Sequence, residues 1–156
     1  MTDDAIDRLL DAAADELAAY GHLLTGSEAG GARLVEDAIV RVFARRRRPG
    51  AAAERLVKEE MRVIHLASIR RHTPPQDEPV TGGIGAALAA LTPPERAVVV
   101  LRHHDRFAIP QIAAAMRTTE DEVEALLAQS LAKLTATLGP IDPVMDPVPV
   151  LTRGVR

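Results

Sequence analysis

The proline- and glycine-rich segment from Thr73 to Gly85 constrains the fold of this chain more than any other feature. Its sequence, TPPQDEPVTGGIG, contains three prolines and three glycines and almost no residue suited to an apolar core. Proline cannot continue a helix and glycine disfavours one, so this composition is typical of a linker. We therefore predict two small helical domains at residues 1–72 and 86–139, joined by a linker at 73–85 and followed by a proline-rich tail at 140–156.

The apolar residues favour helices in both halves. They make up 47% of the chain, yet most are alanine, leucine and valine, and the aromatic residues are limited to Tyr20, Phe43 and Phe107. Alanine and leucine have high helix propensity, whereas the aromatic residues that favour strands are almost absent. The composition therefore predicts an all-α protein.

Three helical segments are predicted in the first half. Apolar residues recur at steps of three and four over Asp4–Leu24, and a second such stripe follows a small-residue turn at Gly30 and Gly31. This second helix runs into the block Arg45–Arg48, which is typical of a solvated helix end but would also suit a contact with nucleic acid or another macromolecule. A third helix over residues 51–71 is expected to expose Lys58, Glu59, Arg62, Arg70 and Arg71.

The second half carries a more specific pattern. We predict helices over Ala86–Leu91, Pro93–His104, Pro110–Met116 and Glu120–Leu138. Three alanines at 113–115 would let two helices cross closely, which is typical of a helix-turn-helix. Thr119 followed by Glu122 forms a capping-box pattern at the start of the last helix. An ordinary helical bundle would produce the same pattern, so the residues alone leave both interpretations open.

Several classes of protein are disfavoured by what the sequence lacks. Without cysteine there are no disulfides, thiolate zinc sites or cysteine nucleophiles, and a reducing, cytoplasmic setting is expected. The acidic N-terminus argues against a signal for export, and the lack of an apolar run of ~20 residues argues against membrane insertion. His103 and His104 have no carboxylate at ligand spacing, and no nucleophile or phosphate-binding motif occurs. We expect no metal, no cofactor and no enzyme activity.

Two stretches resemble a known family in the correct order. AALAALTPPERAVVVLRHHDRFAIPQIAAAM is similar to the C-terminal promoter-binding domain, region 4, of extracytoplasmic-function sigma factors of the sigma-70 family. LLTGSEAGGARLVEDAIVRVFARRR is similar to the LTG turn and the polymerase-docking helix of region 2 in the same family. The resemblance covers Asp4 to Leu138 and implies a sigma factor that binds core RNA polymerase and promoter DNA and is controlled by an anti-sigma factor.

The resemblance also implies positions for the binding residues. Polymerase contacts fall on Leu34, Val35, Glu36, Asp37, Ile39, Arg41 and Phe43, although the apolar members would equally suit the core. Phosphate contacts fall on three arginines of the third helix, Arg62, Arg70 and Arg71. Further DNA contacts fall on the turn and last helix of the helix-turn-helix, at Arg117, Thr118, Thr119, Gln129 and Lys133.

The sequence departs from the family where DNA would be read. Glu124, Leu126 and Gln129 stand where family members place lysine and arginine, and Glu120 to Glu122 crowd the start of the same helix with acids. The third helix also lacks the asparagine expected near Val63. The chain's net charge is −3, whereas a protein that holds DNA by itself usually has a basic surface.

Three functions follow as alternatives. The first is a sigma factor that directs promoter-specific initiation. The second is a degenerate sigma-like regulator with weak or no DNA binding, which acts by contact with an anti-sigma factor or polymerase. The third is a helical interaction module unrelated to transcription.

Overall fold

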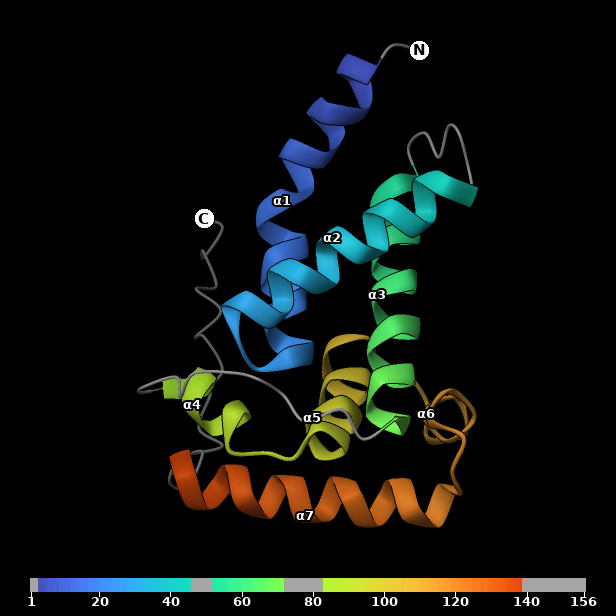
Figure 1. Cartoon of the computed structure of the whole chain (residues 1–156). Helices are drawn as coiled ribbons and strands as arrows, with labels where there is room; N and C mark the ends of the chain where they lie inside the picture. Colours follow the sequence, from blue (N-terminus) through green and yellow to red (C-terminus); the bar gives the residue numbers. More distant parts are fainter. Residues whose placement is uncertain (1–2, 46–51, 72–82, 139–156) are drawn as a thin grey trace, which may run out of the picture.

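The computed structural model describes residues 3–45, 52–71 and 83–138. Every regular element within these ranges is a helix, which confirms the all-α prediction. Figure 1 shows three long helices above a second group that ends in a long horizontal helix. Most of the predicted linker, the predicted tail and Arg46 to Arg48 of the arginine block lie outside the described residues.

The first lobe consists of α1 (Asp3–Thr25), α2 (Glu28–Arg45) and α3 (Ala53–Arg70). These bounds agree with the predicted helices at both ends of α1 and for most of α3. Each helix turns its three- and four-residue apolar stripe inward, because burying that stripe is what stabilises a helix of this length in water. The shared core contains Leu17, Tyr20, Leu24, Leu34, Ala38, Val42, Val57 and Met61.

The start of α2 differs from the prediction. The helix begins at Glu28, so Gly30 and Gly31 lie within its first turns rather than in a turn that precedes it. A Cβ atom on Gly31 would lie 2.7 Å from the backbone nitrogen of His22, and one on Gly21 would lie 2.8 Å from the carbonyl oxygen of Gly31. Ser27 Oγ accepts a hydrogen bond from the Gly30 N–H at 3.0 Å at the helix start. The two glycines at 21 and 31 therefore permit the close approach of α1 and α2.

Gly31→Ala is expected to lower the free energy of unfolding by about 1 to 3 kcal/mol, because the added methyl group meets backbone that can move only with its whole helix. Thermal and urea denaturation followed by circular dichroism would measure the loss. Ala32→Ser, at the next and exposed position, is the control and should change stability by less than about 0.5 kcal/mol. A fully stable Gly31→Ala variant would show that the helices do not approach as closely as described.

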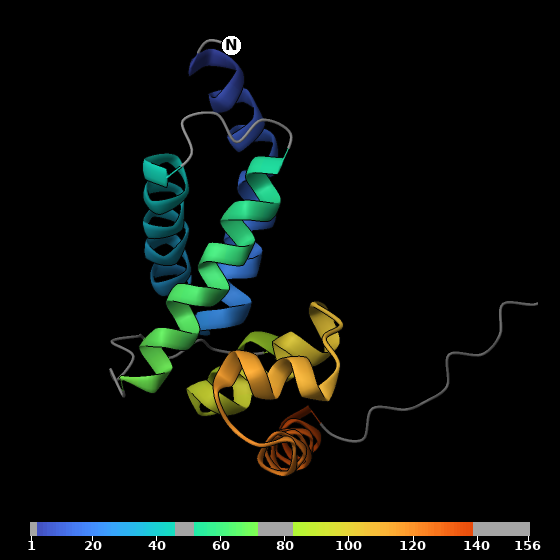
Figure 2. The ribbon, with the colours of Figure 1, turned by 90° about the vertical axis from the view of Figure 1, so that its right-hand side faces the viewer.

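The second lobe contains α4 (Gly83–Ala89), α5 (Pro93–Val99), the π-helix η2 (Val100–His104), α6 (Ile109–Met116) and α7 (Glu120–Leu138). Helix α4 begins three residues earlier than predicted, so the last three residues of the predicted linker are helical. Helix α7 runs beneath α4, α5 and α6 in Figure 1, and Figure 2 views it nearly end-on. The core of the second lobe contains Leu66, Ala97, Val98, Leu101, Ile112, Ala113 and Val123.

The predicted helix Pro93–His104 is present but changes its winding. Thr92 caps its start through a capping box, with Thr92 N–H donating to Glu95 Oε2 at 2.9 Å and Glu95 N–H donating to Thr92 Oγ1 at 3.4 Å. Beyond Val99 the backbone widens into a π turn, where Asp105 N–H donates to Val100 O at 3.0 Å. The wider turn determines where Asp105 lies.

The two lobes pack against each other in the described structure. Leu66 of α3 belongs to the core of the second lobe, and Val100 of η2 belongs to the core of the first. Arg96 of α5 is 4% exposed and donates from Nη1 to Thr25 O at 2.6 Å, at the end of α1. The same guanidinium donates to carbonyl oxygens near the end of α4, at Leu88 and Leu91, 2.9 and 3.1 Å away. The division into two domains stays a prediction from the sequence.

Candidate functional site

The outer face of α2 presents part of the predicted polymerase-binding set. Glu36, Asp37 and Arg41 are exposed. Val40 was not among the predicted residues, yet it is 68% exposed and lies between them on the helix surface. The three- and four-residue spacing from Glu36 and Asp37 to Val40 is the sequence signal that would have identified it. The other predicted residues turn toward the core of the first lobe, where Leu34 is buried and Val35, Ile39 and Phe43 are half-buried.

Between α2 and α3 lies a pocket of about 270 Å³ whose lining includes the carboxylates of Glu59 and Glu60. The side chain of Glu60 is 11% exposed and forms ion pairs with Arg41 at 3.6 Å and Arg45 at 3.0 Å. Arg45, the one described residue of the predicted arginine block, therefore joins α2 to α3. Val63 forms part of the pocket wall and is 56% exposed.

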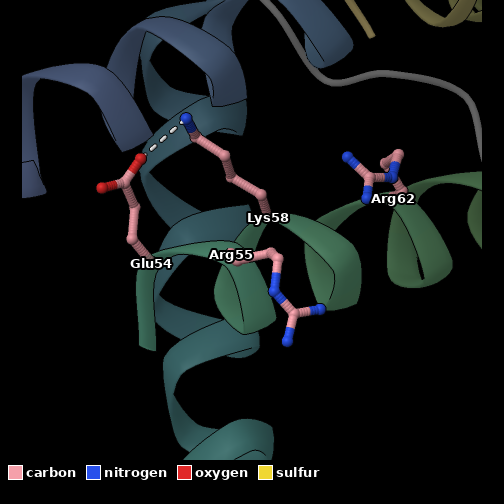
Figure 3. Close-up of a pocket in the computed structure, with 4 residues that line it drawn as sticks. All are labelled: Glu54, Arg55, Lys58 and Arg62. Carbon is pink, nitrogen blue, oxygen red and sulfur yellow. Dashed lines mark ion pairs between the residues drawn. The ribbon is translucent and has the colours of Figure 1, made fainter. Parts of the chain in front are cut away.

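A second pocket, of about 320 Å³, lies along α3 and is lined by Glu54, Arg55, Lys58 and Arg62 (Figure 3). Its cations have acidic partners. Lys58 Nζ lies 2.9 Å from Glu54 and also pairs with Glu16 of α1, and these acids outweigh burial and raise the pKa of Lys58. Arg55 pairs with Glu59 at 2.6 Å. The prediction that Lys58 and Arg62 point freely to solvent was wrong, because their side chains are only 17% and 19% exposed.

Arg62 is held where the two lobes meet. Its Nη1 donates to Tyr20 Oη at 3.3 Å and lies 3.7 Å from Asp105 Oδ1, and its Cζ lies 5.4 Å from the centre of the Phe107 ring. Tyr20 in turn donates to Asp105 Oδ2 at 2.7 Å. Burial and the neighbouring Asp105 carboxylate raise the pKa of Tyr20 well above its usual value, so its hydroxyl remains a donor at neutral pH.

The other two predicted DNA contacts of α3 lie at its C-terminal end. Arg70 and Arg71 are both exposed. Arg70 Nη1 donates to the carbonyl oxygen of Ala115 in α6 at 3.4 Å, so the end of α3 lies beside the first helix of the helix-turn-helix. Arg71 continues the backbone past the end of α3. Their role in DNA binding stays a prediction.

The turn before α7 has the predicted cap. Arg117 adopts a left-handed conformation with φ of 55° and is exposed, which ends α6. Thr119 Oγ1 accepts from Glu122 N–H at 3.2 Å, and Glu122 Oε2 accepts from Thr119 N–H at 3.3 Å, which confirms the capping box. The Thr118 hydroxyl also donates to Glu122. Two of the predicted DNA contacts, Thr118 and Thr119, are thus hydrogen-bonded to Glu122. This acid would face phosphate if the turn contacted DNA as predicted.

The surface of α7 offers little positive charge. Glu120, Asp121, Glu124 and Gln129 are exposed, and Lys133 is the only basic residue between Glu120 and Leu138. Acids in the first turn stabilise a helix through its dipole but repel phosphate. Leu126 is half-buried against the core of the second lobe, so it does not stand on the outer surface.

Lys133 is engaged by a buried acid. Its Nζ lies 2.8 and 2.9 Å from the two carboxylate oxygens of Glu95, which is 4% exposed. Burial opposes ionisation of Glu95, but hydrogen bonds from Lys133 and Thr92 outweigh it and hold the pKa of this carboxyl below its usual value. Ser130 Oγ donates to the backbone oxygen of Glu95 at 3.3 Å. These contacts anchor α7 on α5. They also pair Lys133, which was predicted to contact DNA, with an acid of the same chain.

Residues 82–134 match the family model of sigma-70, region 4. The match covers about a third of the chain, from α4 through the helix-turn-helix to most of α7. It supports the resemblance of this part of the chain to the sigma-70 family and a sigma-factor-like role in transcription, and region 4 is a regulatory domain rather than an enzyme domain. No curated protein matches the chain.

The described ranges contain neither a cluster of histidine and acidic residues that could hold a metal ion nor, by length and hydropathy, a helix able to cross a lipid bilayer.

Proposed function

We propose that this chain is an extracytoplasmic-function type sigma factor that docks on core RNA polymerase through α2 and brings its region 4 helix-turn-helix to promoter DNA. The observation that carries the proposal is the region 4 match, which coincides with the helix-turn-helix. The outer face of α2 supports it, because Glu36, Asp37, Val40 and Arg41 lie together there on the surface and are not part of the core. Such a mixture of charged and apolar groups is typical of a protein interface.

The docking proposal predicts that Val40→Asp weakens binding to core polymerase by at least about tenfold, because a charge would be desolvated within the interface. Val40 is exposed, so this change tests docking without disturbing the core, unlike a change at the half-buried Ile39 or Phe43. Affinity would be measured by fluorescence anisotropy with labelled protein and purified core enzyme. Ala18→Asp, on the exposed surface of α1, is the control. Full affinity of a folded Val40→Asp variant would contradict docking through α2.

A second function is favoured by the charge of α7. Its exposed acids and the engagement of Lys133 by Glu95 favour a regulator with weak DNA affinity, which acts by contact with an anti-sigma factor or polymerase. A specific DNA-binding protein usually makes on the order of 6 to 10 phosphate contacts, and α7 offers few groups for them. The two functions differ in whether α7 faces DNA.

Restoring positive charge to α7 separates the two functions. Glu124→Lys combined with Gln129→Arg is expected to raise affinity for duplex DNA about tenfold or more at low salt and to steepen its salt dependence, because both positions are exposed. Electrophoretic mobility shift at several salt concentrations would measure this. Asp11→Lys combined with Ala14→Arg makes the same charge change on exposed sites of α1 and is the matched control. If the α7 and control variants bound DNA equally, α7 would not face phosphate and the protein-contact function would be preferred.

A further inference from the structure

Two of the three arginines that α3 would offer to nucleic acid are in contact with the second lobe. Arg62 lies against Asp105 and Phe107, and Arg70 donates to the carbonyl oxygen of Ala115. All three partners follow the predicted linker in sequence and belong to the lobe that carries the helix-turn-helix. In this arrangement the side chain of Arg62 is only 19% exposed, and a phosphate group could approach it from the pocket along α3 but not from the side that the second lobe covers.

Asp105 is the centre of this contact. Its side chain is 9% exposed and accepts a hydrogen bond from Tyr20 at 2.7 Å, with Arg62 3.7 Å away. Tyr20 is 1% exposed, and its ring lies 5.1 Å from that of His104, whose Nδ1 is 3.2 Å from Asp105. A buried carboxylate is unfavourable unless it is paired, and the hydroxyl and guanidinium that pair with Asp105 come from the first lobe. Separation of the lobes would return this carboxylate to water and free Arg62.

The apolar part of the contact is modest. Leu66 and the partly buried Ile69 of α3 pack in the second core and Val100 of η2 enters the first, while the remaining residues of each core come from its own lobe. Contacts between domains that combine a few apolar residues with charged groups allow the domains to separate and reclose. The polar cluster therefore contributes a substantial part of what keeps the lobes together.

We propose that Tyr20, Arg62 and Asp105 form an autoinhibitory latch, which holds the two lobes closed and restricts the access of nucleic acid to Arg62. A partner that binds the open form more tightly than the closed form shifts the chain toward the open form. The closure of the two lobes is independent of the proposed function. The inference that nucleic acid is the excluded ligand, by contrast, rests on the proposed function.

The test uses the full chain and reads lobe separation directly. Because the chain has no cysteine, cysteines at the exposed positions Ala44 in α2 and Ala132 in α7 can carry a fluorescent donor and acceptor. Asp105→Ala is expected to lower energy transfer between them while far-ultraviolet circular dichroism stays helical. Tyr20→Phe, which removes only the hydroxyl, should lower it to a smaller extent. Asp121→Ala removes the same charge from an exposed site on α7 and should leave energy transfer unchanged.

The second measurement is the affinity of the same variants for a mixed-sequence DNA duplex at low salt. Asp105→Ala should bind at least about tenfold more tightly than Asp121→Ala, because Arg62 becomes available to phosphate beside the already exposed Arg70 and Arg71. Unchanged energy transfer in folded Asp105→Ala and Tyr20→Phe variants would overturn the latch. Lower energy transfer without a gain in DNA affinity would support the latch but overturn its role in excluding DNA, and it would count against DNA contact by α3 in the proposed function.

Discussion

Arg96→Met is expected to lower the free energy of unfolding by about 3 to 5 kcal/mol. Arg96 is 4% exposed, and its guanidinium donates to backbone oxygens of Thr25, Leu88 and Leu91. Methionine fills a similar volume but donates no hydrogen bond, so these carbonyl groups would lose a partner in a buried setting. Because the carbonyls lie at the ends of two helices from different lobes, both lobes should be destabilised. Urea denaturation followed by circular dichroism would measure the loss.

Two further variants test the reason for this loss. Arg55→Met changes the same side chain at an exposed site on α3, where arginine pairs only with Glu59 among the contacts described, and should cost less than about 1 kcal/mol. Gly26→Ala should reproduce part of the Arg96 effect, because Gly26 has φ of +78° and an added Cβ would lie 2.5 Å from Arg96 Cζ. An Arg96→Met variant as stable as Arg55→Met would show that the guanidinium does not support the helix ends.

Acidification is expected to destabilise the fold through His65. This residue of α3 is 8% exposed, and its Nε2 has no hydrogen-bond partner among the described residues. Burial, together with the positive charge of Arg96, lowers the pKa of His65 to about 4. Its usual value is 6.5, so the unfolded chain binds more protons than the folded chain between these values. The fold is therefore most stable above pH 6.5 with respect to this group, and stability falls as the pH is lowered toward 4.

The expected loss from His65 alone is about 2 kcal/mol between about pH 7 and about pH 5. Denaturation curves recorded across this range would measure it. His65→Phe should flatten the pH dependence, because phenylalanine fills the site without binding a proton, whereas His103→Phe at an exposed position should leave it unchanged. Glu95, whose pKa is lowered, adds a loss only below its usual value of 4.5, so the chosen window separates the two groups. Equal slopes for the wild type and His65→Phe would contradict this assignment.

The helices could be predicted from the sequence because their signals are local. Apolar spacing located α1 and α7, and the pair Thr119 and Glu122 located the start of α7 correctly. Gly31 shows where local signals are insufficient. Glycine is as common in turns as at close helix crossings, and only the position of Gly21 on a separate helix decides between the two.

The partners of the charged residues could not be predicted, because they come from distant parts of the chain. Arg62 and Lys133 both occupy positions that resemble DNA contacts, yet in the fold they face Asp105 and Glu95. Neither acid is close in sequence to its partner. Sequence periodicity indicates which side of a helix a cation occupies, but not which acid a neighbouring helix brings beside it. The outward acids of α7, by contrast, were apparent from the sequence because they need no partner.

The π turn of η2 makes the position of Asp105 depend on how the backbone winds. In an α-helix each residue turns by about 100°, so regular winding of the same residues, without the extra residue that the π turn accommodates, would carry Asp105 about that far further around the axis. The carboxylate would then no longer point at Tyr20, although every side chain of the contact would still be present in the sequence. Whether two such chains can close in the same way can therefore be decided by whether this segment winds as a π turn or as a regular α-helix, a difference that a comparison of aligned residue types alone would overlook.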